Sequence, residues 1–206
     1  MQKPRSGHVG TVLFLACAAM ACGDGGPRAP TTSTPVDLLV GPYSLTVTTG
    51  SACATLPEAL RIRTYSARIE SRGPDNFVVT LSDAQFLADE QIGERAFRVH
   101  CSSWYGLGCN QFTASREADQ LRFLLAGNWE RFDDEFAGDG GMIVEVIPPD
   151  NDRLGISGTG LGRLDGTTIQ ASIDGRVWNC PAQYASYQNE CSICDNVSVA
   201  MTFVRR

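Results

Sequence analysis

Cysteine is the residue type with the most evident chemistry in this chain of 206 residues. Of its 8 cysteines, Cys17 lies in an apolar N-terminal stretch and Cys22 directly follows that stretch. The other cysteines are Cys53, Cys101, Cys109, Cys180, Cys191 and Cys194. An even number of cysteines in an exported chain predicts a set of disulfides, although several pairings are open.

Groups for acid–base or metal chemistry are sparse. Downstream of Cys22 the only histidine is His100, so a Ser-His-Asp arrangement could use that residue alone and a multi-histidine metal site cannot form within one chain. Cys191 and Cys194 have the spacing of a redox or zinc pair, but the helix N-terminus or second pair that such sites need is not visible. We therefore expect no catalytic residue, no metal and no cofactor, with a hydrolase using paired carboxylates as a distant alternative.

Two loops carry the remaining candidates. Trp104 and Tyr105 lie between Cys101 and Cys109, and aromatic side chains on a disulfide-pinned loop suit the rim of a ligand site or a lid over one end of the domain. Acidic residues gather farther along the chain, where the regular spacing of a calcium loop is absent and a solvated hairpin tip is expected. They are Glu130, Asp133, Asp134, Glu135 and Asp139.

Residues 1–21 have the pattern of a signal peptide. Lys3 and Arg5 give a cationic start, and an apolar stretch of roughly a dozen residues follows. This stretch is too short to span a bilayer as a helix, which needs about 20 residues. Ala19-Met20-Ala21 has the small-x-small pattern that a signal peptidase reads, so cleavage would leave Cys22 at the new N-terminus.

A cysteine in this position, followed by Gly23, resembles the lipidated cysteine of bacterial lipoproteins. The resemblance implies that Cys22 carries fatty acyl chains such as palmitate, which anchor the chain in a membrane. Because Gly23 is not acidic, it also implies the outer membrane. Ala19 and Met20 depart from the usual Leu and small residue of that family, and ordinary cleavage to a secreted protein is the alternative.

Charge excludes other partners. Without Lys3 and Arg5, 15 of the 17 basic residues remain against 23 acidic ones, which gives a net charge of about −8. An acidic protein repels nucleic acid and gains little from anionic lipid surfaces, so the lipid is the expected membrane contact. Residues 22–40 are rich in Pro, Thr and Gly and predict a flexible tether.

From residue 41 onward the dominant pattern is alternation of apolar and polar residues, which predicts strands joined as antiparallel hairpins. Short helices are expected only at 56–60 and 83–92. We expect residues 41–206 to form one all-β domain, an antiparallel up-and-down barrel of about 8–10 strands with a β-sandwich as the alternative. Alternate side chains should share a single interior. They begin with Tyr43, Leu45, Val47, Tyr65, Ala67, Ile69, Phe77, Val79 and Leu81, continue with Leu121, Phe123, Leu125, Met142, Val144 and Val146, and end with Val197, Val199, Met201 and Phe203.

Closure of such a barrel predicts the disulfides. The end of the first strand should lie beside the start of the last, which pairs Cys53 with Cys194. Cys101 with Cys109 would pin a local loop, and Cys180 with Cys191 remains.

The stretch Gly41-Pro42-Tyr43-Ser44-Leu45 resembles the Gly-x-Trp-x-Leu first strand of lipocalin-like proteins, with Tyr in place of Trp. Arg205 and Arg206 end the last predicted strand, where lipocalins also often keep an arginine. The whole layout is similar to a group of uncharacterised bacterial lipoproteins. The resemblance implies a lipocalin-like barrel with a small apolar ligand inside and no reaction; the alternative is a structural or protein-interaction lipoprotein whose barrel its own side chains fill. A ligand-sized cavity would distinguish the two.

Overall fold

The computed structural model describes residues 38–51, 53–87, 91–92, 97–101, 107–125, 128–131, 141–182 and 191–206. They all belong to one unit, which spans Thr31–Arg206. The predicted signal peptide, Cys22 and residues 22–37 of the predicted tether lie outside the described residues. In the part of the chain that is described, no helix is long and apolar enough to cross a membrane.

Strands make up nearly all of the regular structure, and every strand pairing is antiparallel. In chain order the elements are β1 (Gly41–Thr49), the 3₁₀ helix η2 (Glu58–Leu60), β2 (Ile62–Ser71), β3 (Asn76–Ser82), β4 (Gln91–Ile92), β5 (Phe97–His100), β6 (Asn110–Glu117), β7 (Gln120–Leu125), β8 (Asn128–Arg131), β9 (Gly141–Ile147), β10 (Asp152–Asp165), β11 (Thr168–Cys180) and β12 (Ser192–Arg205).

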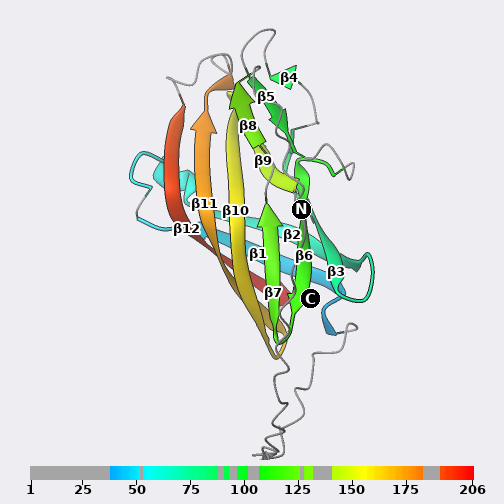
Figure 1. Cartoon of the computed structure of the whole chain (residues 1–206). Coiled ribbons are helices and arrows are strands. Elements are labelled where there is room, and N and C mark those ends of the chain that lie inside the picture. Colours follow the sequence, from blue (N-terminus) through cyan, green and yellow to red (C-terminus); the bar gives the residue numbers. More distant parts are fainter. Residues whose placement is uncertain are drawn as a thin grey trace, which may run out of the picture. The chain divides into compact units, whose positions relative to one another are not determined.

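Eight strands close into a barrel in the order β1-β2-β3-β6-β7-β10-β11-β12, because β12 pairs with β1 and β10 pairs with both β7 and β11 (Figure 1). Strand β9 is an extra strand. Along β10, β9 follows β7 as the pairing partner: β10 pairs with β7 through Gly158–Arg163 and with β9 through Asp152–Ile156. The prediction of a single antiparallel barrel is confirmed.

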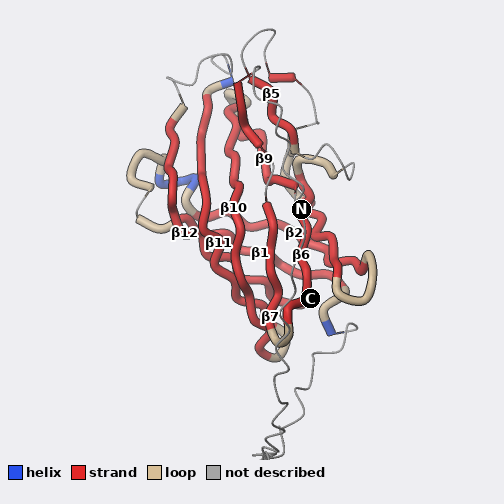
Figure 2. The backbone as a smooth tube through the Cα atoms, in the orientation of Figure 1, coloured by secondary structure: helices blue, strands red, loops and turns tan. Residues whose placement is uncertain are grey.

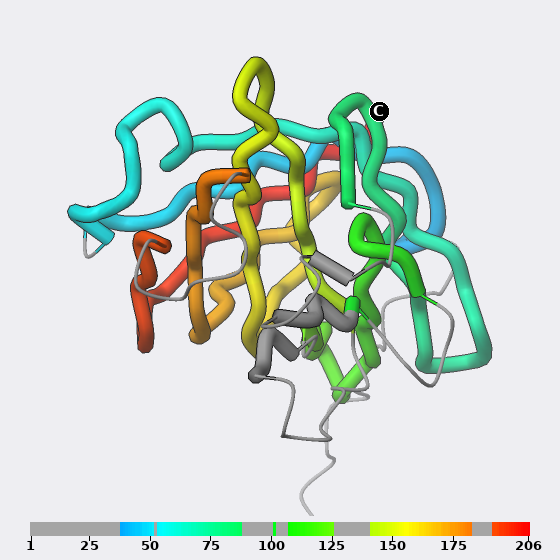
Figure 3. Tube along the Cα trace, turned by 90° about the horizontal axis from the view of Figure 1, so that it is seen from above, coloured from blue at the N-terminus to red at the C-terminus, as the bar shows by residue number. Residues whose placement is uncertain are grey.

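Glycines allow the long strands to bend where the barrel closes. Gly158 of β10 lies opposite Gly175 of β11, and a Cβ on Gly158 would stand 2.5 Å from a carbonyl oxygen of β11. A Cβ on Gly160 would stand 1.9 Å from another carbonyl oxygen. Such contacts exclude any side chain, so the glycines permit the close approach that a tightly curved sheet needs. Figure 1 shows β10–β12 passing in front of β1 and β2, and in the view from above β1 and β2 (blue and cyan) cross the opposite side of the barrel (Figure 3).

The predicted inward faces of β1, β2, β3, β7 and β12 are confirmed, since their apolar members are all buried in one core. Leu39, which precedes the expected boundary at Gly41, is buried in the same core. Strand β6, which the sequence did not predict, contributes Phe112 and Ala114. The core lies inside the barrel.

The predicted face of β9 is wrong. Met142 and Val144 pack outside the barrel in a second cluster with Trp178, and it is Ile143 that belongs to the barrel core. Every residue of β9 from Gly141 to Val146 is buried, because the strand is covered on both faces. A strand buried on both sides has no polar face to fix its register in the sequence. The expectation of a single interior therefore needs correction.

The predicted helix at 83–92 is also wrong in its described part. The amide of Leu87 donates to the carbonyl of Val144, and the amide of Val146 donates to the carbonyl of Gln85. These residues extend the barrel wall beside β9, so their backbone groups are used between strands and not within a helix. Residues 91–92 form β4, which joins β5 and β8 in a separate three-stranded sheet (Figure 1). Strands dominate the described backbone, and helices are confined to short turns (Figure 2). The other predicted helix, 56–60, appears as the single turn η2.

Candidate functional site

The barrel interior is filled by its own side chains at the described positions. Phe123 stacks on Phe203 with ring centroids 5.5 Å apart, and Tyr43 meets Phe203 edge-on at 6.1 Å. At the end of the barrel where β12 finishes, Arg205 lies with its guanidinium 6.0 Å from the Tyr43 ring and donates to the carbonyls of Leu38 and Val40. The two positions that carry the lipocalin resemblance are thus in contact and close this end of the barrel.

Toward the other end, the described part of the interior holds an ion pair with a buried carboxylate. The Glu145 carboxylate, on β9, is 2% exposed. Its Oε2 accepts hydrogen bonds from Tyr65 Oη at 2.8 Å and from Arg63 Nε at 2.9 Å, and its Oε1 accepts from Arg63 Nη2. Arg63 and Tyr65 lie on alternate, inward positions of β2, so the group joins two strands that are not neighbours in the barrel.

The two side chains that donate to Glu145 both have raised pKa values. Burial, and then the negative charge of Glu145, raises the pKa of Tyr65 well above its ordinary value, so the phenol keeps its proton and donates. The hydrogen bond to Glu145 raises the pKa of Arg63, which stays charged. The three hydrogen bonds to the Glu145 carboxylate connect β2 with β9.

A hollow lies on the outer wall of the barrel. It is a groove of about 520 Å³ across β3, β6 and β7, and Leu107 also lines it. Its lining residues are Arg72, Asn76, Phe77, Val78, Leu107, Thr113, Ala114, Ser115, Arg122 and Leu124. We call it the outer groove.

Strand register divides the outer groove into two rows of outward side chains. Val78, Thr113 and Leu124 stand side by side on the three strands and form the apolar row. Leu107 (4% exposed) and Val78 (5% exposed) are almost fully buried there, although Val78 points away from the barrel core. One pleat farther along, about 7 Å away, the same strands place a polar row. It consists of Asn76, Ser115 and Arg122.

Arginines gather at the polar row. Arg122 donates to Glu117 from Nε at 2.5 Å and from Nη2 at 2.9 Å, and this pair is about half exposed. Arg116 Nε donates to Asp75 at 2.8 Å. Arg72, at the turn between β2 and β3, lines the groove, and no carboxylate among the described residues is placed against its guanidinium. Arg72 and Arg122 therefore line this end of the groove, whereas Arg116 shares the opposite face of β6 with Ala114 and is not part of the lining.

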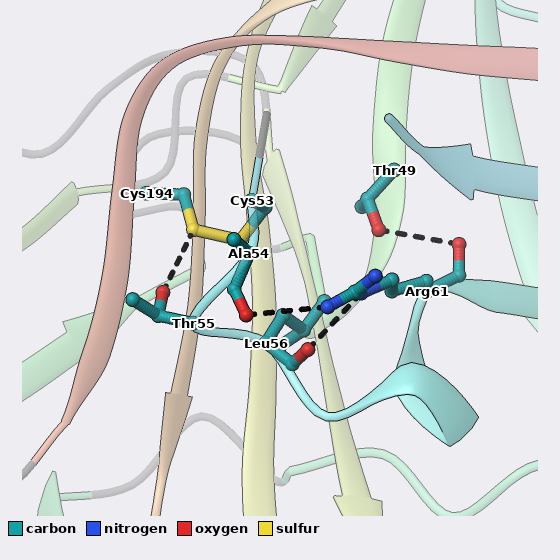
Figure 4. Close-up of a disulfide and its surroundings, with 7 residues drawn as sticks. All are labelled: Thr49, Cys53, Ala54, Thr55, Leu56, Arg61 and Cys194. Carbon is teal, nitrogen blue, oxygen red and sulfur yellow. Dashed lines mark hydrogen bonds between the residues drawn. A yellow bond between two sulfur atoms is a disulfide. The ribbon is translucent and has the colours of Figure 1, made fainter. Parts of the chain in front are cut away.

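The structure contains the three predicted disulfides, Cys53–Cys194, Cys101–Cys109 and Cys180–Cys191. Figure 4 shows how the first is held: Thr55 Oγ1 lies 3.3 Å from Cys194 Sγ, and Arg61 donates to the carbonyls of Ala54 and Leu56. This disulfide fastens the loop after β1 to the start of β12, as barrel closure requires. The predicted pairing is confirmed.

The structure does not describe the other predicted site residues. Trp104 and Tyr105, residues 132–140 of the acidic loop and the side chains of His100 and Glu130 lie outside the described residues. Leu107, which follows Tyr105 closely in the chain, does line the outer groove.

Sequence reasoning missed both Glu145 and the outer groove. The signal for Glu145 was a lone carboxylate within the apolar run Met142–Ile147, where an unpaired charge would be costly. The groove had no local signal, since its lining comes from three strands and a loop.

No family model matches the chain and no curated protein matches it. Similar solved structures include a redesigned beta barrel, b11L5F_LGL, which is 12% identical with a TM-score of 0.37 and covers 85% of this chain and 97% of that one. They also include EF1p2_mFAP2b bound to DFHBI, 13% identical with a TM-score of 0.36, covering 82% of this chain and 95% of that one. At these TM-scores the barrel assignment depends on the strand pairing of this chain alone.

Proposed function

We propose that this chain is an exported, lipid-anchored and non-enzymatic barrel that binds a small apolar ligand in the outer groove. The groove carries the proposal: its volume of about 520 Å³ suits a small molecule, for which pockets of about 300–1,000 Å³ are usual. The described interior is packed with aromatic and aliphatic side chains, so the outer wall is the better place for a ligand than the barrel interior.

Disulfides support the proposed export. Three cysteine pairs are joined in the described residues, and such bonds form and persist in oxidising, extracytoplasmic compartments. A lipid on Cys22 would then hold the barrel at a membrane, with the outer membrane as the proposed location. Secretion without a lipid is the alternative.

The proposal that the chain is non-enzymatic is based on Glu145. Among the described residues it is the one buried carboxylate, and Arg63 and Tyr65 occupy both of its oxygens. A hydrolase with paired carboxylates would need two acids facing each other across a cleft.

A second candidate function is a structural or protein-interaction lipoprotein, which the filled interior favours. The two candidate functions differ in whether the outer groove binds small molecules. In the second, the barrel wall would contact another protein and the groove would show no affinity for small molecules.

The test is binding of a neutral fluorescent apolar probe, N-phenyl-1-naphthylamine, to the mature chain, residues 22–206, with Cys22→Ser so that no acyl chain competes. Leu124→Glu places a charge in the apolar row and should abolish binding. Ile62→Glu, at a position 62% exposed outside the groove, is the matched control and should leave binding unchanged. Equal binding by all three proteins, or none by the parent, would refute a ligand site in the groove.

The anchor is tested separately by mass spectrometry of the protein purified from its own membranes. We expect the mass of a diacylglyceryl group and an acyl chain on Cys22. An unmodified N-terminal cysteine would show that the chain is secreted without a lipid.

A further inference from the structure

We infer that the outer groove selects an anionic amphiphile, with its hydrocarbon chain on the apolar row and its carboxylate or phosphate among the arginines. This inference rests on the proposed function and adds the chemical class of the ligand. It follows from the order of the two rows along the groove and from the charges beside one of them.

The apolar row can hold a chain. Val78, Leu124 and Leu107 come from β3, β7 and the loop before β6, and Thr113 lies between the two strand residues. Since adjacent strands are about 4.8 Å apart, the row is about 10 Å wide, enough for several methylene groups. Each methylene that leaves water adds to the affinity of the chain for the row.

The polar row can hold a head group. Arg72 and Arg122 both line the groove. The Nη1 of Arg122 still has donors to offer, because its pair with Glu117 uses Nε and Nη2. That pair is exposed, so exchanging Glu117 for a ligand oxygen would cost little. Ser115 and Asn76, on the same row, add a hydroxyl and an amide as further donors.

Charge complementarity selects the anion. Arg72 and Arg122 are the charged residues of the groove lining as described, and no carboxylate is among them, whereas the chain as a whole has more acidic than basic residues. The groove is therefore a local positive site on an acidic protein. The arginines of the groove would repel a cationic amphiphile. Such a ligand would also gain no partner there.

The spacing of the rows fits one molecule. Along each strand the polar row is one pleat from the apolar row, about 7 Å away. That distance corresponds to the first few bonds of an amphiphile, so head and chain can occupy both rows together.

The experiment compares four ligands with the same dodecyl chain: dodecanoate, dodecyl phosphate, dodecanol and dodecyltrimethylammonium, all below their micelle concentrations. Each displaces N-phenyl-1-naphthylamine from the mature chain carrying Cys22→Ser. At least one anion should bind about tenfold or more tightly than dodecanol, because a hydrogen bond to a charged group contributes about 1.5–3 kcal/mol. The cation should bind more weakly than dodecanol.

Substitutions of arginine test which residues cause the preference for the anion. Arg72→Gln combined with Arg122→Gln should lower the preference for the anion to about equal with dodecanol and leave dodecanol affinity unchanged. Arg68→Gln is the control, since Arg68 lies on β2 outside the groove and is 64% exposed in its side chain. A carboxylate or phosphate source is distinguished by which of dodecanoate and dodecyl phosphate binds more tightly.

The outcomes separate the two proposals. Equal affinity for dodecanol and both anions, or a preference that survives the double arginine substitution, would overturn the anionic inference while the groove remained a ligand site. Failure of every ligand to displace the probe, with Leu124→Glu also without effect, would overturn the proposed function itself.

Discussion

Removing the Cys53–Cys194 disulfide should destabilise this barrel more than removing either of the others. This bond joins residues separated by 141 positions, whereas Cys180–Cys191 spans 11 and Cys101–Cys109 spans 8. A cross-link restricts the unfolded chain more when it closes a longer loop.

The loop lengths give the magnitudes. Loop-closure entropy predicts a loss of about 5 kcal/mol in the free energy of unfolding for Cys53→Ala with Cys194→Ala, and about 3 kcal/mol for Cys180→Ala with Cys191→Ala. The second double variant is a suitable control, because it also removes one disulfide beside β12. Cys53, Cys194 and Cys180 are all buried, so the loss of packed sulfur atoms is similar in the two variants.

Equilibrium unfolding in guanidinium chloride, followed by tryptophan fluorescence, measures both losses. The dependence of the free energy on denaturant should also become steeper when the long loop is opened, since the unfolded chain then exposes more surface. Equal losses in the two variants, or a larger loss for Cys180 and Cys191, would refute the argument that the long loop dominates.

Three further perturbations test the barrel wall and the buried ion pair. Arg63→Met should lower the free energy of unfolding by about 3 kcal/mol, because Glu145 would remain buried without its counter-charge, and adding Glu145→Met should recover part of this loss. Denaturant titrations of the two single variants and the double variant would decide it; additive losses would contradict the coupling. Gly160→Ala should cost about 1–3 kcal/mol, since a Cβ there would stand 1.9 Å from a carbonyl oxygen, whereas Thr159→Ala at the neighbouring exposed position should change the thermal midpoint little. The raised pKa of Tyr65 gives stability that is complete below pH 10 and falls as the unfolded chain ionises above it, by up to about 1.4 kcal/mol per pH unit. Tyr65→Phe should therefore show a shallower loss above pH 10 in pH-dependent urea unfolding, and an unchanged slope would be evidence against the buried phenol.

Much of this barrel is predictable from its amino-acid pattern. Alternation with period two identified the inward faces of β1, β2, β3, β7 and β12, because one side of each strand faces the core and the other faces water. The disulfides followed from the same pattern. Once the first and last strands are neighbours, Cys53 and Cys194 must lie close together, and the other cysteines have local partners.

Three elements could not be predicted locally. Strand β6 has few apolar residues, and Phe112 and Ala114 become inward only because β3 and β7 flank them. Strand β9 is covered on both faces, so its composition did not reveal which side faces the barrel. Residues 85–87 have no strand pattern of their own. They are part of the barrel wall because their backbone groups form hydrogen bonds with those of β9.

By itself, the sequence predicted the strand class, a closed barrel with a β-sandwich as the alternative, the disulfide pairing and export, of which export stays a prediction. These features depend on local periodicity, on composition and on which residues are neighbours along the chain. Only the tertiary structure decided that Glu145 pairs with Arg63 and Tyr65 and that the described interior is packed. It also decided that the outer groove, with its apolar row and its polar row, lies on the outer wall. Those features depend on strand register across the sheet, which brings together residues that are far apart in the chain and carry no common pattern.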